Sequence, residues 1–156
     1  MIEIEGLKKR FGQSIALDEV SMHVRDGAMY GFVGPNGAGK TTTIRCMMGL
    51  LAADGGKLLI NGIDMEKEPK KALSQIGYIP DDFGVYDNLK VLEYMEFFAS
   101  CYGITGLSAR KRSMTLLDQV GLEGKSDFYV DSLSKGMKQR LCLARALVHN
   151  PSILIM

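Results

Sequence analysis

A glycine-rich segment that contains one lysine and a run of threonines is the part of this sequence best suited to chemistry. Within FVGPNGAGKTTTIRCMMG, Gly34, Gly39, Lys40 and Thr41 have the spacing of a phosphate-binding loop. Glycines allow a tight loop whose backbone N–H groups turn inward around phosphate oxygens, and the helix that follows adds its positive end. Lys40 can reach the β and γ phosphates, and the Thr41 hydroxyl can coordinate Mg²⁺. A glycine-rich turn before an ordinary helix is the alternative, and the complete pattern in its strand-to-helix context argues against it.

A second segment with chemical potential is DSLSKGMKQRLCLARAL, which begins at Asp131. Ser134 is a candidate N-cap, and we expect the helix to run from Lys135 to His149. The apolar side of this helix consists of Leu141, Ala144, Leu147 and Val148. A helix N-terminus that faces outward can hold an anion, but an ordinary capped helix explains these residues equally well.

Strands and turns must position the glycine-rich segment. Alternation of apolar and polar residues predicts an antiparallel sheet, with Ser21 and His23 on its exposed side. Continuous apolar runs predict buried strands at Ala28–Val33 and in IGYIP, and Asn61-Gly62 predicts a tight turn after GGKLLI. The expected strands of the first half are 2–7, 16–24, 28–33, 55–60 and 76–80.

Helical periodicity takes over in the second half of the chain. Apolar residues recur three apart from Leu89 to Val120, and the stretch YGITGLSAR separates two helices. After the helix that begins at Lys135, Asn150-Pro151 forms a turn and ILIM begins another buried strand. The order of elements predicts a mixed α/β fold.

The composition limits the possible functions. The 156 residues suffice for one domain or part of one, and a net charge of +1 with 24% charged residues does not suggest a nucleic-acid binder. The clusters Lys8-Lys9-Arg10 and Arg110-Lys111-Arg112 are expected to be solvated faces. The three cysteines have no metal-ligand spacing and are expected to be reduced thiols. No apolar run approaches the ~18 residues of a membrane span, so we expect a cytosolic chain.

The sequence resembles the nucleotide-binding domain of ABC transporters along essentially its whole length. GPNGAGKTTT resembles the Walker A loop of that family, and LSKGM resembles its signature motif, usually Leu-Ser-Gly-Gly-Gln. The segment KQRLCLARALVHNPSILIM continues like the signature helix and the start of the Walker B strand. No Asn-Lys-x-Asp motif typical of GTPases is present.

The resemblance implies a set of ATP-binding residues, in which the aromatic ring in KKRFG stacks on adenine. These residues are Phe11, Gly34, Pro35, Asn36, Gly37, Ala38, Gly39, Lys40, Thr41 and Thr42. A second set would face the ATP held by a partner subunit: Leu133, Ser134, Lys135, Gly136 and Met137. Lys135 and Met137 depart from the family pattern, whereas Ser134 and Gly136 match it.

The implied metal ligands are Thr41 and Asp81. Asp81 stands where the family normally has a glutamine that contacts Mg²⁺, and a carboxylate is also a hard oxygen ligand but is charged and one methylene shorter. The segment that follows Asp81 resembles the helical subdomain of ABC exporters of the drug, sodium or ABC-2 type.

The resemblance also implies a fold and partners. We expect an α/β P-loop NTPase core with an N-terminal antiparallel β subdomain and an inserted α-helical subdomain, within one incomplete domain at 1–156. Its parts would be the β-rich and P-loop core at 1–83, the helical subdomain at 84–133, and the signature helix and last strand at 134–156. The partners would be a second nucleotide-binding subunit, with ATP sandwiched between the two, and a transmembrane permease at the inner face of the cell membrane. No nucleic acid is expected as a partner.

Hydrolysis raises a separate expectation. In the family the strand begun by ILIM leads to an aspartate and a glutamate, and later a histidine, that position Mg²⁺ and water, and none of these lies within the 156 residues. We therefore expect a truncated domain without catalytic residues of its own, in which His149 caps the signature helix. A soluble ABC-type ATPase without a membrane partner and a non-hydrolysing nucleotide-binding fragment remain alternatives.

Overall fold

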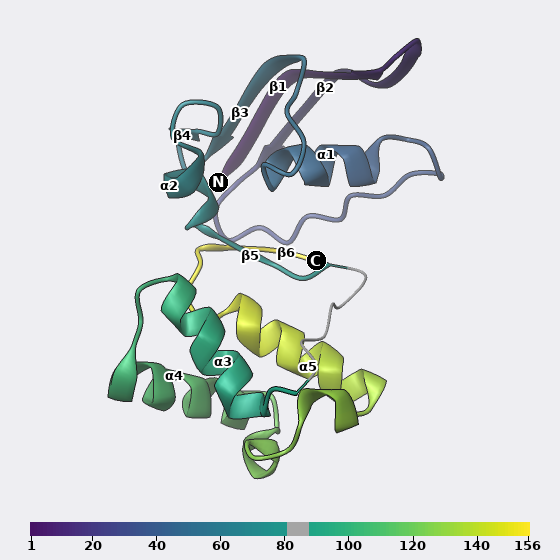
Figure 1. The fold of residues 1–156 in the computed structure, drawn as a ribbon. Helices are drawn as coiled ribbons and strands as arrows, with labels where there is room; N and C mark the ends of the chain where they lie inside the picture. The colour runs from purple at the N-terminus through teal and green to yellow at the C-terminus, as the bar shows by residue number, and fades with distance from the viewer. Residues whose placement is uncertain (81–87) are drawn as a thin grey trace. The chain divides into compact units, whose positions relative to one another are not determined.

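The computed structural model describes residues 1–80 and 88–156. The chain divides into two compact units, which we call unit 1 (Met1–Gln75) and unit 2 (Ile76–Met156). Figure 1 shows unit 1 as a sheet with α1 beside it, and unit 2 as helices gathered on one side of a short parallel strand pair. The finer boundaries expected after residues 83 and 133 stay a prediction.

Unit 1 is built on an antiparallel sheet whose order among the described residues is β2-β1-β3-β4. These strands are β1 (Ile2–Phe11), β2 (Ser14–Val24), β3 (Gly55–Ile60) and β4 (Ile63–Asp64). Asn61 and Gly62 join β3 to β4 with positive φ angles of 51° and 76°, as a tight hairpin turn requires. The antiparallel sheet, its exposed Ser21 and His23, and this turn are confirmed.

A bulge changes which face of β1 is buried. The buried residues at the start of the strand are Ile2 and Ile4, at even positions, but the next buried residue is Leu7, at an odd position. The register shifts between the pairs Ile4↔Met22 and Leu7↔Val20, where Gly6 has φ 58°. An extra residue at a bulge reverses the alternation of a strand, so Leu7 and Lys9 lie on the same face.

The segment predicted to be a buried strand, Ala28–Val33, is irregular and largely exposed. Met29 is fully exposed and Val33 is 91% exposed, and the segment joins neither described sheet. The prediction was wrong because an apolar run shows what a segment can bury but does not specify a neighbour, and a strand requires ladder hydrogen bonds to one. The helices of unit 1 are α1 (Lys40–Met47), which follows this segment and the glycine-rich loop, and α2 (Pro69–Leu73).

Unit 2 packs its helices around one apolar core. Its elements are β5 (Ile76–Tyr78), α3 (Val91–Cys101), α4 (Gly106–Gln119), two 3₁₀ turns (Glu123–Lys125 and Val130–Ser132), α5 (Lys135–Ala146) and β6 (Ile153–Ile155). Tyr94, Leu117, Leu122 and Leu141 are fully buried at the centre of this core. β5 and β6 pair in parallel, which confirms that the IGYIP and ILIM segments form strands.

None of the helices in the described parts of the chain is long and apolar enough to span a membrane.

The end of α5 differs from the prediction. The helix stops at Ala146, three residues before His149, and the chain then turns through Asn150 with φ 56°. Arg112 of α4 caps this end, since its guanidinium donates to Leu147 O at 2.9 Å and to Val148 O at 3.2 Å. The predicted capping role of His149 is wrong, because its Nε2 lies 3.0 Å from Ile76 O on β5.

Candidate nucleotide-binding site

The glycine-rich loop adopts a conformation that only glycine takes readily at two positions. Gly37 and Gly39 both have φ 84°, and Ala38 N donates to Pro35 O at 3.2 Å between them. Positive φ at alternate positions turns successive backbone N–H groups toward one side of the loop, which creates a concave site for an anion. The side chains of Asn36 and Ala38 are exposed, so the loop is open to solvent.

Lys40 folds back over this loop. Its ammonium donates to Gly34 O and to Pro35 O, the latter at 2.8 Å. Because Lys40 is also the first residue of α1, the ammonium and the positive end of the helix lie at the same loop. This arrangement favours an anionic ligand.

The last glycine of the loop is wedged between β2 and α1. A Cβ at Gly39 would lie 2.6 Å from Leu17 Cδ2 and 2.8 Å from Ala16 O. On the helix side, Gly39 O accepts the Thr43 N–H at 2.8 Å and the Thr43 hydroxyl at 3.0 Å. Thr43 is fully buried and fixes the loop from within, a role not predicted from the sequence although it is the third threonine of the run.

The residues that would contact Mg²⁺ are only partly described. Thr41 is exposed in the first turn of α1, so its hydroxyl is accessible, and Thr42 is half-buried. Asp81, the second predicted metal ligand, lies outside the described residues. Among the residues that the structure describes, no cluster of three or more His, Cys, Asp or Glu side chains could hold a metal alone. A site of this kind fits Mg²⁺ that is bound largely by phosphates and water.

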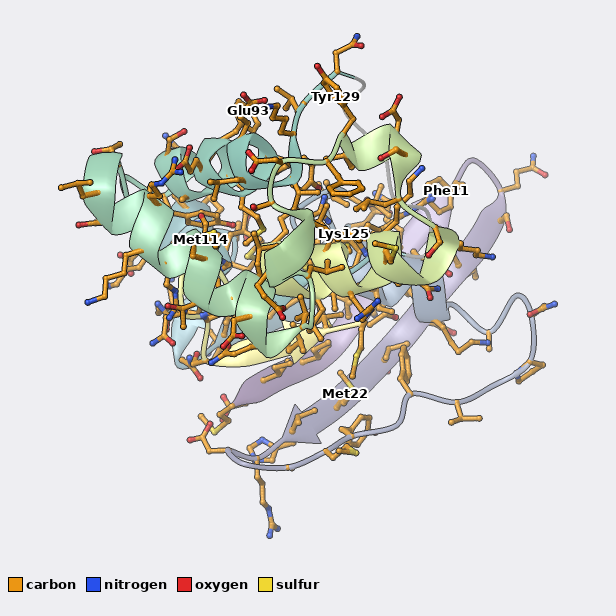
Figure 2. All side chains as sticks on the ribbon, turned by 90° about the horizontal axis from the view of Figure 1, so that it is seen from below. Phe11, Met22, Glu93, Met114, Lys125 and Tyr129 are labelled. Atoms are coloured by element: carbon orange, nitrogen blue, oxygen red, sulfur yellow. The ribbon has the colours of Figure 1, made fainter. Side chains whose placement is uncertain are left out.

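Phe11, which is labelled in Figure 2, is the last residue of β1. The residue is 53% exposed. The Lys9 ammonium lies 5.8 Å from the centroid of the ring. A half-exposed aromatic face can stack on a purine base without a fixed hydrogen-bond pattern. In Figure 1 the β1–β2 hairpin and the loop before α1 extend toward the same end of unit 1.

The predicted signature residues in unit 2 divide into two groups. Leu133 is buried and Met137 packs against the core, so these two anchor the start of α5. Ser134, Lys135 and Gly136 are exposed. The Ser134 hydroxyl accepts the Met137 N–H at 3.3 Å, which confirms the predicted N-cap.

Comparisons with known proteins agree with these features. Residues 17–156 match the model of a protein family described as "ABC transporter". The chain belongs to the ABC transporter family. Membership of this family implies nucleotide binding.

Curated relatives in the ABC transporter family are named for ATP binding. The chain is 38% identical to the probable multidrug ABC transporter ATP-binding protein YbhF of Escherichia coli, covering 100% of this chain and 27% of that protein. It is 36% identical to the linearmycin resistance ATP-binding protein LnrL of Bacillus subtilis, covering 100% of this chain and 50% of that protein. The chain therefore spans a quarter to a half of the length of these relatives.

Solved ABC structures share the fold. An ATP-binding subunit of an ABC transporter superposes with a TM-score of 0.87 at 30% identity, over 98% of this chain and 64% of the other. The structure of cbiO1 from Clostridium perfringens, described as part of the ABC transporter complex cbiONQ, superposes with a TM-score of 0.86 at 26% identity, over 98% of this chain and 63% of the other. The predicted fold class, an α/β P-loop NTPase with an antiparallel β subdomain and a helical subdomain, is confirmed.

Proposed function

We propose that this chain is the ATP-binding part of an ABC transporter ATPase, which couples ATP binding and hydrolysis to the movement of a substrate through a transmembrane partner. The observation that carries the proposal is the loop in which Gly37 and Gly39 have positive φ and the Lys40 ammonium lies over the loop carbonyls. Relatives named as ATP-binding proteins of transporters support it.

In this proposal each part of unit 1 has one task in holding Mg·ATP. The backbone N–H groups from Gly34 to Thr42 bind phosphate oxygens, and Lys40 exchanges its loop carbonyls for the β and γ phosphates. Thr41 would hold Mg²⁺, and Asp81, which is not part of unit 1 and lies outside the described residues, stays the second predicted ligand. Bound Mg²⁺ would neutralise charge on the phosphates. The Phe11 ring stacks on adenine.

The exposed start of α5 would serve a second subunit. Ser134, Lys135 and Gly136 would approach the γ-phosphate of ATP held by that subunit, where the helix N-terminus favours negative charge. Leu133 and Met137 would hold the helix in place. The complex would lie at the inner face of the cell membrane, bound to its permease, without a nucleic-acid partner. We assign no catalytic residue within residues 1–156.

The first experiment measures ATP binding by equilibrium dialysis with Mg²⁺. Lys40→Ala should weaken ATP binding by about tenfold to a hundredfold, because a hydrogen bond to a charged group contributes about 1.5–3 kcal/mol. Lys70→Ala removes an equal charge from α2, outside the loop, and should leave binding unchanged. Equal affinities of the Lys40→Ala and wild-type chains would refute the proposal.

A further inference from the structure

The carboxylate of Asp54 binds the end of β1 through hydrogen bonds that are not part of the backbone pairing between strands. Its Oδ1 accepts the Lys9 ammonium at 2.7 Å, and its Oδ2 accepts the Arg10 N–H at 2.7 Å. The Asp54 N–H donates to Lys8 O at 2.9 Å. One residue therefore fixes three consecutive residues of β1, directly before Phe11.

The sheet register explains why this end of β1 needs support. The last pair between β1 and β3 is Lys8↔Gly55, so β1 continues past the end of β3. Beyond that point its one partner strand among the described residues is β2, through Arg10↔Ile15 and Phe11↔Ser14. A two-stranded hairpin without a third strand is only marginally stable in water. Asp54 replaces the missing third strand, since its carboxylate takes the Arg10 N–H that such a strand would have accepted.

Lys9 extends this support toward the aromatic ring. Its side chain is only 12% exposed and is held between the Asp54 carboxylate and the face of Phe11, whose centroid lies 5.8 Å from the ammonium. The Lys9 hydrogen bond, and after it the Arg10 N–H, keep the pKa of Asp54 below its usual value, so the carboxylate is charged at neutral pH. A charged pair of this kind restrains the ring better than a neutral contact would.

We propose that Asp54 is a positioning residue for base recognition, which fixes Lys9 and Arg10 so that the Phe11 ring is presented to the nucleotide base. This inference rests on the proposed function, because it requires that a nucleotide binds in the loop with its base on Phe11. Asp54 itself touches no phosphate in this proposal. Its removal should weaken the contribution of the base and leave the contribution of the phosphates intact.

The test compares two ligands, ATP and inorganic tripolyphosphate, which lacks the base. Stacking of a base on an aromatic ring accounts for roughly fivefold to a hundredfold in affinity, which is the upper limit for any residue acting through the ring. Asp54→Ala should weaken ATP binding by about threefold to thirtyfold within this limit. Tripolyphosphate binding should change less than about twofold, and the double variant Asp54→Ala, Phe11→Ala should bind ATP no more weakly than Phe11→Ala alone.

Two further variants serve as a control and as a milder substitution at Asp54. Glu68→Gln breaks the Glu68–Lys71 pair elsewhere in unit 1 and should bind both ligands as the wild type does. Asp54→Asn keeps an oxygen for the Arg10 N–H but loses the charge that holds Lys9. It should show a smaller selective loss of ATP binding, and it carries the test if Asp54→Ala does not fold.

The outcomes separate the two proposals. Unchanged ATP affinity in the Asp54 variants, or an equal loss for ATP and tripolyphosphate, would overturn the positioning role. If the wild type binds neither ligand, or if Lys40→Ala binds both as well as the wild type, the proposed function itself fails and the positioning role falls with it.

Discussion

Substituting alanine at Gly39 and at Gly37 tests how the glycine-rich loop is held against β2. Both glycines have φ 84°, so an alanine at either position is forced to the same unfavourable positive φ. They differ in their surroundings. A Cβ at Gly37 meets no atom within 4 Å, whereas a Cβ at Gly39 meets Leu17 Cδ2 at 2.6 Å and Ala16 O at 2.8 Å.

The magnitudes follow from these contacts. Placing a non-glycine residue in the left-handed region costs about 1–2 kcal/mol, so Gly37→Ala should lower the free energy of unfolding by about that amount. Gly39→Ala carries the same cost and must also displace the Ala16 backbone or the buried Leu17 side chain. Overpacking of this kind costs about 1–3 kcal/mol, for a total of about 2–5 kcal/mol.

The assay must report on unit 1 alone, because a chain with two compact units need not unfold in one step. Hydrogen exchange of peptides from residues 1–75, measured without nucleotide, gives the free energy of opening for each variant. The excess loss in Gly39→Ala isolates the contact between the loop and β2. Equal losses in the two variants would refute the reasoning.

Three other predictions concern unit 2 and the thiols. The Ser113 hydroxyl is fully buried without a hydrogen-bond partner among the described residues. Ser113→Ala should therefore raise the free energy of unfolding by about 1 kcal/mol, measured as a higher midpoint of urea unfolding. A lower midpoint would contradict this. Burial lowers the pKa of His149, so the unfolded chain binds a proton more readily than the folded one. The contribution of His149 to the free energy of unfolding should be complete above about pH 6.5 and should decline as the pH falls through the lower pKa of the folded state. In urea unfolding at pH 7.5 and 5.5, the stability of His149→Gln should therefore depend less on pH than the stability of the wild type. Burial raises the pKa of the Cys46 and Cys142 thiols, whereas Cys101 is exposed. Mass spectrometry after brief iodoacetamide treatment should therefore find Cys101 alkylated first. Preferential labelling of either buried thiol would count against the packing described.

The elements that the sequence predicted correctly depend on local information. The loop from Gly34 to Thr41 follows from the residue types themselves, because the backbone there needs glycine and a lysine at fixed spacing. The turn at Asn61-Gly62 and the N-cap at Ser134 are likewise determined within four residues. Periodicity located α3 and α4, since each buries a stripe of apolar residues.

The errors arose where the partner is distant in the sequence. Lys9 and Arg112 were assigned to solvated faces, yet Lys9 pairs with a carboxylate 45 residues away and Arg112 caps carbonyls 35 and 36 residues away. Nothing near either residue indicates such a partner. Ala28–Val33 failed for the same reason, because its composition does not specify a neighbouring strand. The roles of Asp81 and of the exposed signature residues stay predictions.

The contacts of Lys40 define what ligand binding changes in this loop. The ammonium already has acceptors in the loop carbonyls, so an incoming phosphate exchanges one set of oxygens for another rather than recruiting a free charge. Since the same contacts keep the loop in shape, its conformational entropy is lost at folding and not at binding. The loop is therefore preorganised for its ligand, and the ligand can leave without the loop collapsing.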